Sequence, residues 1–137
     1  MKNISILGAG WLGNPLALQL KSNGHQLKVS TTTPEKISFF SENDIESFIV
    51  HVGSNFDTKN LDNLLTDADI LIITIPPGRT QQVEDNYVDK IKTVIPFIEK
   101  HGIKNVIYTS STTVYLSLQG NVNEETPIVP ISEMDQQ

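Results

Sequence analysis

Short apolar runs and helically spaced apolar positions alternate along the whole chain. The runs predict strands, because continuous apolar stretches of this length are typical of strands buried on both faces of a sheet. Regular alternation of such strands with helices is the pattern of a parallel sheet covered by helices. The strands predicted in this way are Asn3–Leu7, Gln26–Thr31, Ser47–Val52, Ile70–Ile75 and Asn105–Thr109.

The segments between the strands carry helix-end signals as well as apolar positions. Gly24 follows the first helix as a C-terminal glycine, and Thr33-Pro34 indicates an N-cap followed by proline at the first helical position. Pro96 lies inside the last helical pattern, where it predicts a kink or a break into two pieces. The predicted helices are about Leu12–Asn23, Pro34–Ser41 (burying Ile37 and Phe40), a short helix with Leu61, Leu64 and Leu65, and a long helix from Val83 to Ile98.

The first predicted strand runs directly into glycines spaced G-x-G-x-x-G, the dinucleotide-binding fingerprint. We expect Gly8 to allow the tight turn, Gly10 to let the backbone approach a pyrophosphate, and Gly13 to let the next helix pack closely. The alternative is an ordinary glycine-rich strand-to-helix turn. With the alternating elements, this loop predicts an α/β fold of Rossmann type, a doubly wound parallel sheet of about five strands with helices on both faces. The candidate cofactor-binding residues of the loop are Gly8, Gly10, Trp11, Leu12 and Gly13.

Composition limits the classes of ligand that this chain is expected to bind. The chain has 137 residues, which suits one domain over 1–137 but is short for a two-part oxidoreductase, so we expect a carboxy-terminal substrate part to be absent. A formal net charge of −6 argues against a nucleic-acid or anionic-membrane surface. No cysteine is available for a disulfide, a thiolate metal site or a nucleophile. No apolar run is long enough to span a bilayer, and we expect a cytoplasmic location.

The end of the second strand predicts which dinucleotide is bound. A cofactor without the extra phosphate usually meets an Asp or Glu there, whereas this chain offers hydroxyls and a lysine. Hydroxyls and an ammonium group favour a 2′-phosphate, so NADP is preferred and NAD stays possible. A polar loop whose threonines cap a helix is the simpler alternative, and both can hold. The candidate residues are Ser30, Thr31, Thr32 and Lys36.

Two further features lie near the expected site. Ile75, Pro76 and Pro77 lie at the carboxyl end of the fourth strand and could line the adenosine side of a cleft. Arg79 could clamp a phosphate or a carboxylate, but a solvated loop arginine is the favoured interpretation. Trp11 could shelter the pyrophosphate or pack against the first helix.

The segment Val106-Ile107-Tyr108-Thr109-Ser110-Ser111-Thr112-Thr113-Val114-Tyr115, together with the glycine loop, resembles the extended or atypical short-chain dehydrogenase/reductase superfamily, the NAD(P)-dependent epimerase/dehydratase group. The resemblance extends over nearly the whole chain and includes Glu125-Thr126-Pro127 and Pro130. It implies that Ser111 is the catalytic hydroxyl, which binds the substrate carbonyl or alcohol beside the nicotinamide. It also implies that Thr109 and Ser110 lie at the cofactor.

The family's Tyr-x-x-x-Lys pair, in which the lysine lowers the pKa of the proton-transferring tyrosine, is absent from this sequence. Tyr115 belongs to the Val-Tyr motif and is not expected to be the base. We therefore expect an amino-terminal Rossmann part that is inactive as this short chain and acts on a small molecule only in a longer form. The alternatives are a non-catalytic nucleotide-sensing module and the amino-terminal domain of a 6-phosphogluconate-dehydrogenase-like enzyme.

The remaining polar residues predict no further chemistry. His25, His51 and His101 are far apart, without a second ligand at metal spacing, and are expected at the surface or at helix ends. A sheet that ends after the fifth strand would leave an apolar edge or face, which predicts a possible homodimer. The aspartates expected to be caps or solvated loop charges are Asp57, Asp62, Asp67 and Asp69.

Overall fold

The computed structural model describes residues 1–53, 57–76, 87–110 and 121–126. Strands and helices alternate through these ranges, and none of the helices there is long and apolar enough to cross a bilayer. The strands are β1 (Asn3–Leu7), β2 (Gln26–Thr31), β3 (Glu46–Ile49), β4 (Ile70–Ile73) and β5 (Asn105–Tyr108). The helices are α1 (Gly13–Ser22), α2 (Lys36–Glu42), α3 (Thr58–Leu65), α4 (Tyr87–Lys92) and α5 (Ile95–Lys100).

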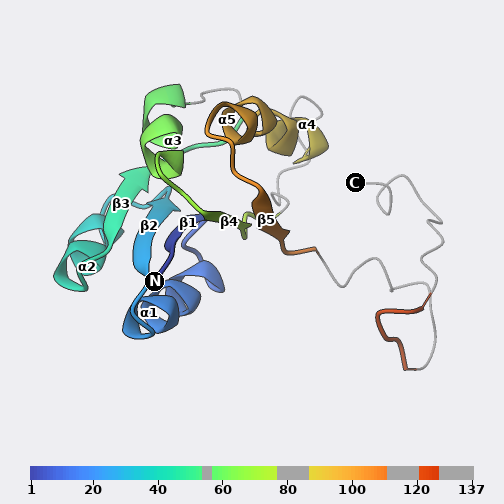
Figure 1. Ribbon diagram of the computed structural model, residues 1–137, viewed down its shortest axis with the longest axis horizontal. Coiled ribbons are helices and arrows are strands. Elements are labelled where there is room, and N and C mark those ends of the chain that lie inside the picture. Colours follow the sequence, from blue (N-terminus) through green and yellow to red (C-terminus); the bar gives the residue numbers. More distant parts are fainter. Residues whose placement is uncertain (54–56, 77–86, 111–120, 127–137) are drawn as a thin grey trace.

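The strands form one parallel sheet in the order β3-β2-β1-β4-β5 (Figure 1). The order reverses at β1, between the crossovers that lead to β2 and to β4. In such sheets ligands bind outside the carboxyl ends of the strands at the reversal point. The predicted Rossmann-type α/β fold is thus confirmed, and the glycine loop follows the central strand.

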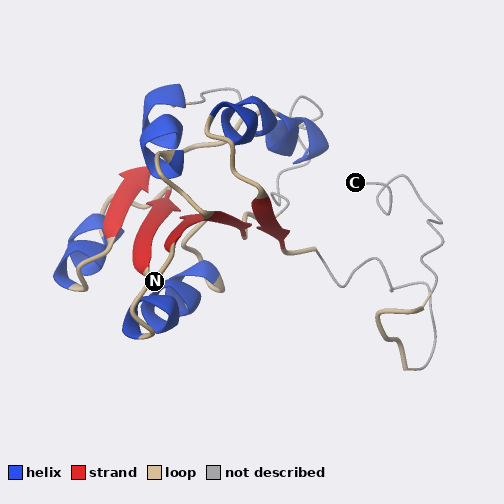
Figure 2. Ribbon diagram, viewed as in Figure 1, coloured by secondary structure: helices blue, strands red, loops and turns tan. Residues whose placement is uncertain are grey.

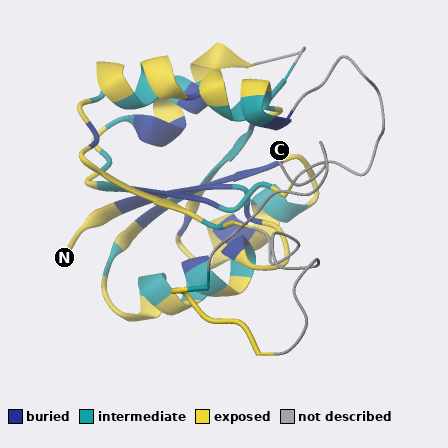
Figure 3. Cartoon of the chain, turned by 90° about the vertical axis from the view of Figure 1, so that its right-hand side faces the viewer, coloured by how far each residue is buried: buried dark blue, intermediate teal, exposed yellow. Residues whose placement is uncertain are grey.

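Helices cover the sheet as two layers, with α1 and α2 on one face and α3, α4 and α5 on the other (Figure 2). Successive strand residues point to opposite faces, so each layer encloses an apolar core of its own. Ile6, Val29 and Phe40 are fully buried on the α1 face, and Leu7, Leu61 and Leu71 are fully buried on the α3 face. Buried residues concentrate between the layers (Figure 3).

Several predicted boundaries were wrong for identifiable reasons. β3 ends at Ile49 rather than Val52, because its partner β2 ends at Thr31, directly opposite Ile49. β4 ends at Ile73 rather than Ile75, because β1 turns away at Gly8 after the Leu7–Ile73 pair.

The predicted start of the second helix was also wrong. Its N-cap is Glu35, not Thr33, and that cap has no side-chain hydrogen bond. Thr33 and Pro34 instead form a turn in which their carbonyls accept from the N–H groups of Lys36 and Ile37. Phe40 is buried as expected, and Ile37 is only partly buried.

The predicted break near Pro96 is present. Helical structure stops at Lys92 and resumes at Ile95, which places Pro96 in the first turn of α5. A proline there is tolerated because the first N–H groups of a helix have no intrahelical acceptor. Residues 83–86, where the predicted helix began, lie outside the described ranges.

Candidate functional site

The glycine loop joins β1 to α1 through two close backbone approaches. Gly8 has a φ of 109°, in the region that favours glycine, and a Cβ there would lie 3.2 Å from both Cγ1 and the backbone nitrogen of Ile75. A Cβ on Gly13 would lie 2.3 Å from the carbonyl oxygen of Gly8. Gly10, in contrast, would meet nothing within 4 Å. The first and third glycines are thus required by the fold, whereas the second faces open space.

The end of β4 braces this loop. The Thr74 hydroxyl donates to the carbonyl oxygen of Gly8 at 2.6 Å, and the Thr74 N–H donates to the carbonyl of Leu7. Sequence reasoning did not select Thr74, because the predicted strand Ile70–Ile75 included it, whereas β4 ends at Ile73.

The end of β2 braces the loop from the other side. Ser30 and Thr31 are 2% and 5% exposed. The Ser30 hydroxyl accepts from the N–H of Gly8 at 2.8 Å, and the Thr31 hydroxyl accepts from the N–H of Thr33 at 3.1 Å. Both hydroxyls therefore take part in shaping the backbone, while Thr32 and Thr33 are exposed.

Among the described residues of the site, Lys36 supplies a positive charge. It lies in the first turn of α2, and its Nζ donates to the carbonyl oxygen of Ala9 at 3.2 Å. This contact brings the ammonium group from the start of α2 onto the glycine loop, 27 residues away in sequence.

These segments enclose one pocket of about 350 Å³ at the carboxyl end of the sheet. It unites eight of the predicted cofactor-binding residues and contains no carboxylate among the described residues. Its lining is Gly8, Ala9, Gly10, Ser30, Thr31, Thr32, Thr33, Lys36, Val50, His51, Val52, Thr74, Ile75 and Pro76.

Sequence reasoning missed the contribution of the third strand. Val50, His51 and Val52 follow β3 directly and line the pocket, because the carboxyl ends of parallel strands meet at the same edge. His51 was expected at the surface, and it is exposed while also lining this pocket.

The other predicted site residues lie elsewhere. Trp11 is 94% exposed and does not pack against α1, so that alternative was wrong; Leu12 is 43% exposed. Thr109 follows β5, where its N–H and hydroxyl both donate to the carbonyl of Ile73 at 3.1 Å, and Ser110 is exposed beside it. Neither lines the pocket. The remaining candidates and motif residues outside the described ranges are Pro77, Arg79, Ser111, Tyr115, Pro127 and Pro130.

A larger hollow of about 490 Å³ lies at the opposite, amino-terminal end of the strands. Its lysine, Lys28, donates to the carbonyl oxygens of Asn63 and Thr66 at 3.1 Å, so this ammonium group caps α3. No residue of the glycine loop lines this hollow. The larger hollow therefore lacks the glycine loop against which the pyrophosphate of a dinucleotide lies.

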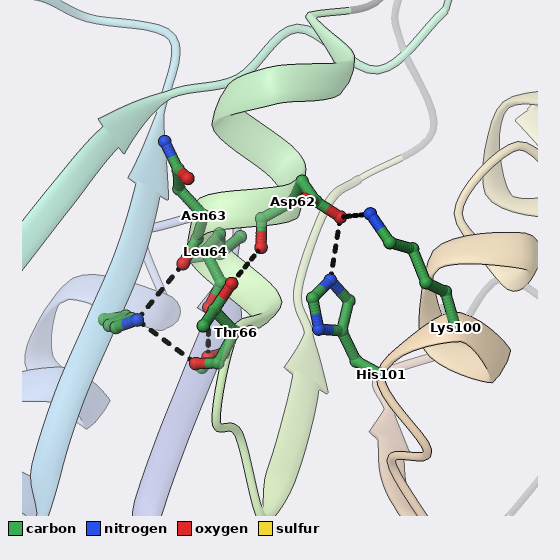
Figure 4. Close-up of polar contacts among 8 residues, drawn as sticks. Asp62, Asn63, Leu64, Thr66, Lys100 and His101 are labelled. Atoms are coloured by element: carbon green, nitrogen blue, oxygen red, sulfur yellow. Dashed lines mark hydrogen bonds and ion pairs between the residues drawn. The ribbon is translucent and has the colours of Figure 1, made fainter.

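Asp62 was expected to be a cap or a loop charge, and this was wrong. It lies inside α3, where Oδ1 accepts from Lys100 Nζ at 2.6 Å and pairs with His101 Nε2 at 2.8 Å (Figure 4). The hydrogen bond from Lys100, followed by that with His101, lowers the pKa of the Asp62 carboxyl below its usual 3.8. The sequence concealed this role because α3 and α5 meet only in the folded chain. Asp57 does cap α3, accepting from the N–H of Asn60 at 3.0 Å.

Comparison with known proteins identifies the family of this chain. A family model described as NAD(P)H-binding matches residues 8–133. Protein YeeZ of Escherichia coli K12 is 36% identical over 134 residues, which cover 96% of this chain and 48% of that protein. The chain thus spans about half the length of this curated relative.

Solved structures share the fold. UDP-N-acetylglucosamine 4-epimerase from Bacillus cereus superposes with a TM-score of 0.66 at 19% identity, covering 96% of this chain and 43% of that one. A short-chain dehydrogenase/reductase superfamily protein from Agrobacterium tumefaciens, solved with bound NAD, has a TM-score of 0.68 at 16% identity, covering 95% and 40%. The chain belongs to the NAD(P)H-binding family and has the Rossmann-type fold of the extended short-chain dehydrogenase/reductase and epimerase group.

Proposed function

We propose that this domain binds NADP in preference to NAD, in the pocket between the glycine loop and the end of β2. The observation that carries the proposal is the contact of Lys36 Nζ with the carbonyl oxygen of Ala9. It brings a positive charge to the same pocket as the exposed hydroxyls of Thr32 and Thr33.

The two cofactors differ by one phosphate on the adenosine ribose. That phosphate gains a charge-assisted hydrogen bond from an ammonium group and further bonds from hydroxyl donors. The free ribose hydroxyls of NAD instead favour an acceptor carboxylate, and no Asp or Glu lines the described part of this pocket. The charge and donor set of the pocket therefore favours NADP.

Titration calorimetry with NADPH and NADH tests this preference. Lys36→Gln removes the charge, and it should weaken NADPH roughly tenfold, the effect of one charge-assisted hydrogen bond, while NADH binding stays the same. Lys104→Gln is the matched control, because Lys104 is exposed and precedes β5 at the opposite end of the sheet. Equal affinities of the unaltered chain for NADPH and NADH would contradict the preference.

We also propose that hydride transfer occurs beside Ser111 only in a longer form, which contributes a small-molecule substrate pocket. The absence of Tyr-x-x-x-Lys from this sequence supports binding without turnover in the present chain. The second candidate, a non-catalytic nucleotide-sensing module, rests on the same absence. NADPH consumption with a panel of ketones separates them, since turnover by the longer form would eliminate the sensing module.

We propose, third, that the domain forms a homodimer through β5. Ile107 is 52% exposed, and Val106 and Tyr108 are 43% and 46% exposed on the other face of this strand. Light scattering should show a dimer at high concentration, and Ile107→Lys should shift it to monomer. Val122→Lys, which changes another exposed apolar residue, should leave the dimer intact. A monomer at all concentrations would contradict the proposed homodimer.

A further inference from the structure

Two tyrosine hydroxyls form a chain of hydrogen bonds that ends at the Ile75–Pro76 segment, which lines the pocket and is called its wall below. Tyr87, the first residue of α4, is 8% exposed, and its hydroxyl donates to the carbonyl oxygen of Ile75 at 2.6 Å. The hydroxyl of Tyr108, from β5, lies 3.0 Å from that of Tyr87. Neither tyrosine lines the pocket, yet both act on a carbonyl of a residue that does.

The direction of this chain of bonds is fixed by proton count. A tyrosine hydroxyl has a single proton, and that of Tyr87 is used on Ile75. Tyr87 must therefore accept from Tyr108, so two consecutive hydrogen bonds link β5, through α4, to the carbonyl of Ile75. Burial raises the pKa of Tyr87, which keeps this proton in place.

The orientation of the Ile75 carbonyl also determines the orientation of the next residue, because that residue is Pro76. The peptide unit between them is planar, so orienting the carbonyl orients the proline ring as well. Proline has no N–H, which leaves this carbonyl as the only polar group by which the peptide plane can be held. The bond from Tyr87 thus sets the position of two adjacent lining residues.

On its other side, Ile75 lies against the glycine loop. Its backbone nitrogen and Cγ1 are both within 3.2 Å of a Cβ placed on Gly8, and Thr74 beside it donates to the carbonyl oxygen of Gly8. The wall residue is therefore held between the glycine loop and the Tyr87 hydroxyl. A small shift of its peptide plane would change the width of the pocket beside Gly8.

We propose that Tyr87 is a positioning residue of the dinucleotide site, which holds the Ile75–Pro76 wall in its binding geometry through its hydroxyl. The inference rests on the proposed function. It predicts an effect different from that of Lys36, because we expect the Ile75–Pro76 segment to contact parts of the dinucleotide that NADP and NAD have in common.

Tyr87→Phe keeps the ring and removes the hydroxyl. We expect NADPH and NADH to weaken by the same factor, roughly three- to tenfold, as for loss of one buried hydrogen bond. Calorimetry is performed well below the unfolding temperature, so that a merely structural loss would leave both affinities unchanged. Thr93→Val is the matched control, because its exposed hydroxyl also makes a 2.6 Å bond to a carbonyl, that of Lys90.

Each result separates the inference from the proposed function. If the unaltered chain binds neither cofactor, both are overturned. If the unaltered chain binds and Tyr87→Phe binds equally well, or loses affinity for NADPH alone, the positioning role is overturned by itself. Should Tyr87→Phe fail to fold, the same calorimetry on Tyr108→Phe tests the positioning role. That change must weaken both cofactors equally, though by less, and an unchanged affinity for both would overturn the role.

Discussion

The hydroxyl of Thr74 and the carbonyl oxygen of Gly8 form a 2.6 Å hydrogen bond that ties the end of β4 to the glycine loop. The two residues are 66 positions apart in sequence. The bond places the loop by contact with its neighbouring strand, so its geometry depends on the sheet order and not only on the local glycine pattern.

Thr74→Val should therefore both destabilise the fold and disturb binding. It removes the donor to Gly8 in a partly buried place, and we expect a loss of about 1 kcal/mol in the free energy of unfolding. Urea denaturation measures that loss, and calorimetry should show weaker NADPH. Thr93→Val, with its exposed hydroxyl, should change neither quantity appreciably, and an unaltered stability of Thr74→Val would show that the bond contributes nothing.

Alanine at the second and third glycines should separate stability from binding. At Gly13 the new Cβ would lie 2.3 Å from the carbonyl oxygen of Gly8, so α1 must move, at a cost of roughly 2–3 kcal/mol or more. At Gly10 it meets nothing, and stability should change by less than about 1 kcal/mol. Gly10→Ala should nevertheless lose NADPH, because the pyrophosphate needs that space.

The result for Gly10 is the decisive part of this comparison. Thermal unfolding without ligand gives the stability of each variant, and calorimetry gives its affinity. If Gly10→Ala binds NADPH as tightly as the unaltered chain, the backbone of the loop does not approach the cofactor in the expected way.

The pairing of Asp62 with Lys100 and His101 should make stability depend on acid pH. Because the folded state lowers the pKa of Asp62, its contribution is complete above the usual 3.8 and is lost as pH falls through the lower, folded-state pKa. Asp62→Asn should therefore lower the Tm at neutral pH, and its difference from the unaltered chain should disappear in strong acid.

Asp89→Asn provides the comparison for this experiment, since Asp89 forms an exposed pair with Lys92 at 3.5 Å within α4. It should have little effect on the Tm at any pH. A Tm difference for Asp62→Asn that persists unchanged into strong acid would mean that the ionised carboxyl is not the stabilising form.

Trp11 provides a spectroscopic report of binding. It is the one tryptophan of the chain and is 94% exposed in the glycine loop. If it shelters the pyrophosphate, saturating NADPH should shift its emission to shorter wavelength, because the indole leaves water. The Gly10→Ala variant should show no shift at the same concentration. An unshifted emission from the saturated, unaltered chain would contradict this role.

The arrangement of strands could be predicted because every strand is an apolar run separated from the next by a helical pattern. Part of the pocket could be predicted from one rule, that the residues at the carboxyl ends of parallel strands lie at the same edge of the sheet. This rule selected Ser30, Lys36, Ile75 and Pro76, whereas His51 and Thr74 were missed because the predicted strands Ser47–Val52 and Ile70–Ile75 included them.

What the sequence did not reveal depends on contacts between helices or on side-chain direction. The pairing of Asp62 with His101 needs the packing of α3 against α5, which no local pattern encodes. Tyr87 lies within the long helix predicted from Val83 to Ile98, yet the contact of its hydroxyl with Ile75 depends on where α4 begins relative to the pocket. Strand ends were misplaced by up to three residues, since the length of the neighbouring strand determines where pairing stops.

The pocket around Lys36 is a small positive region on a chain whose formal net charge is −6. A dinucleotide is itself an anion, so it is repelled during its approach and attracted only over the last few ångströms. The screening length is about 8 Å at physiological ionic strength, which weakens the long-range repulsion more than the close contact. Added salt should thus accelerate association with this domain, the reverse of the behaviour of proteins that draw anions in through a basic funnel.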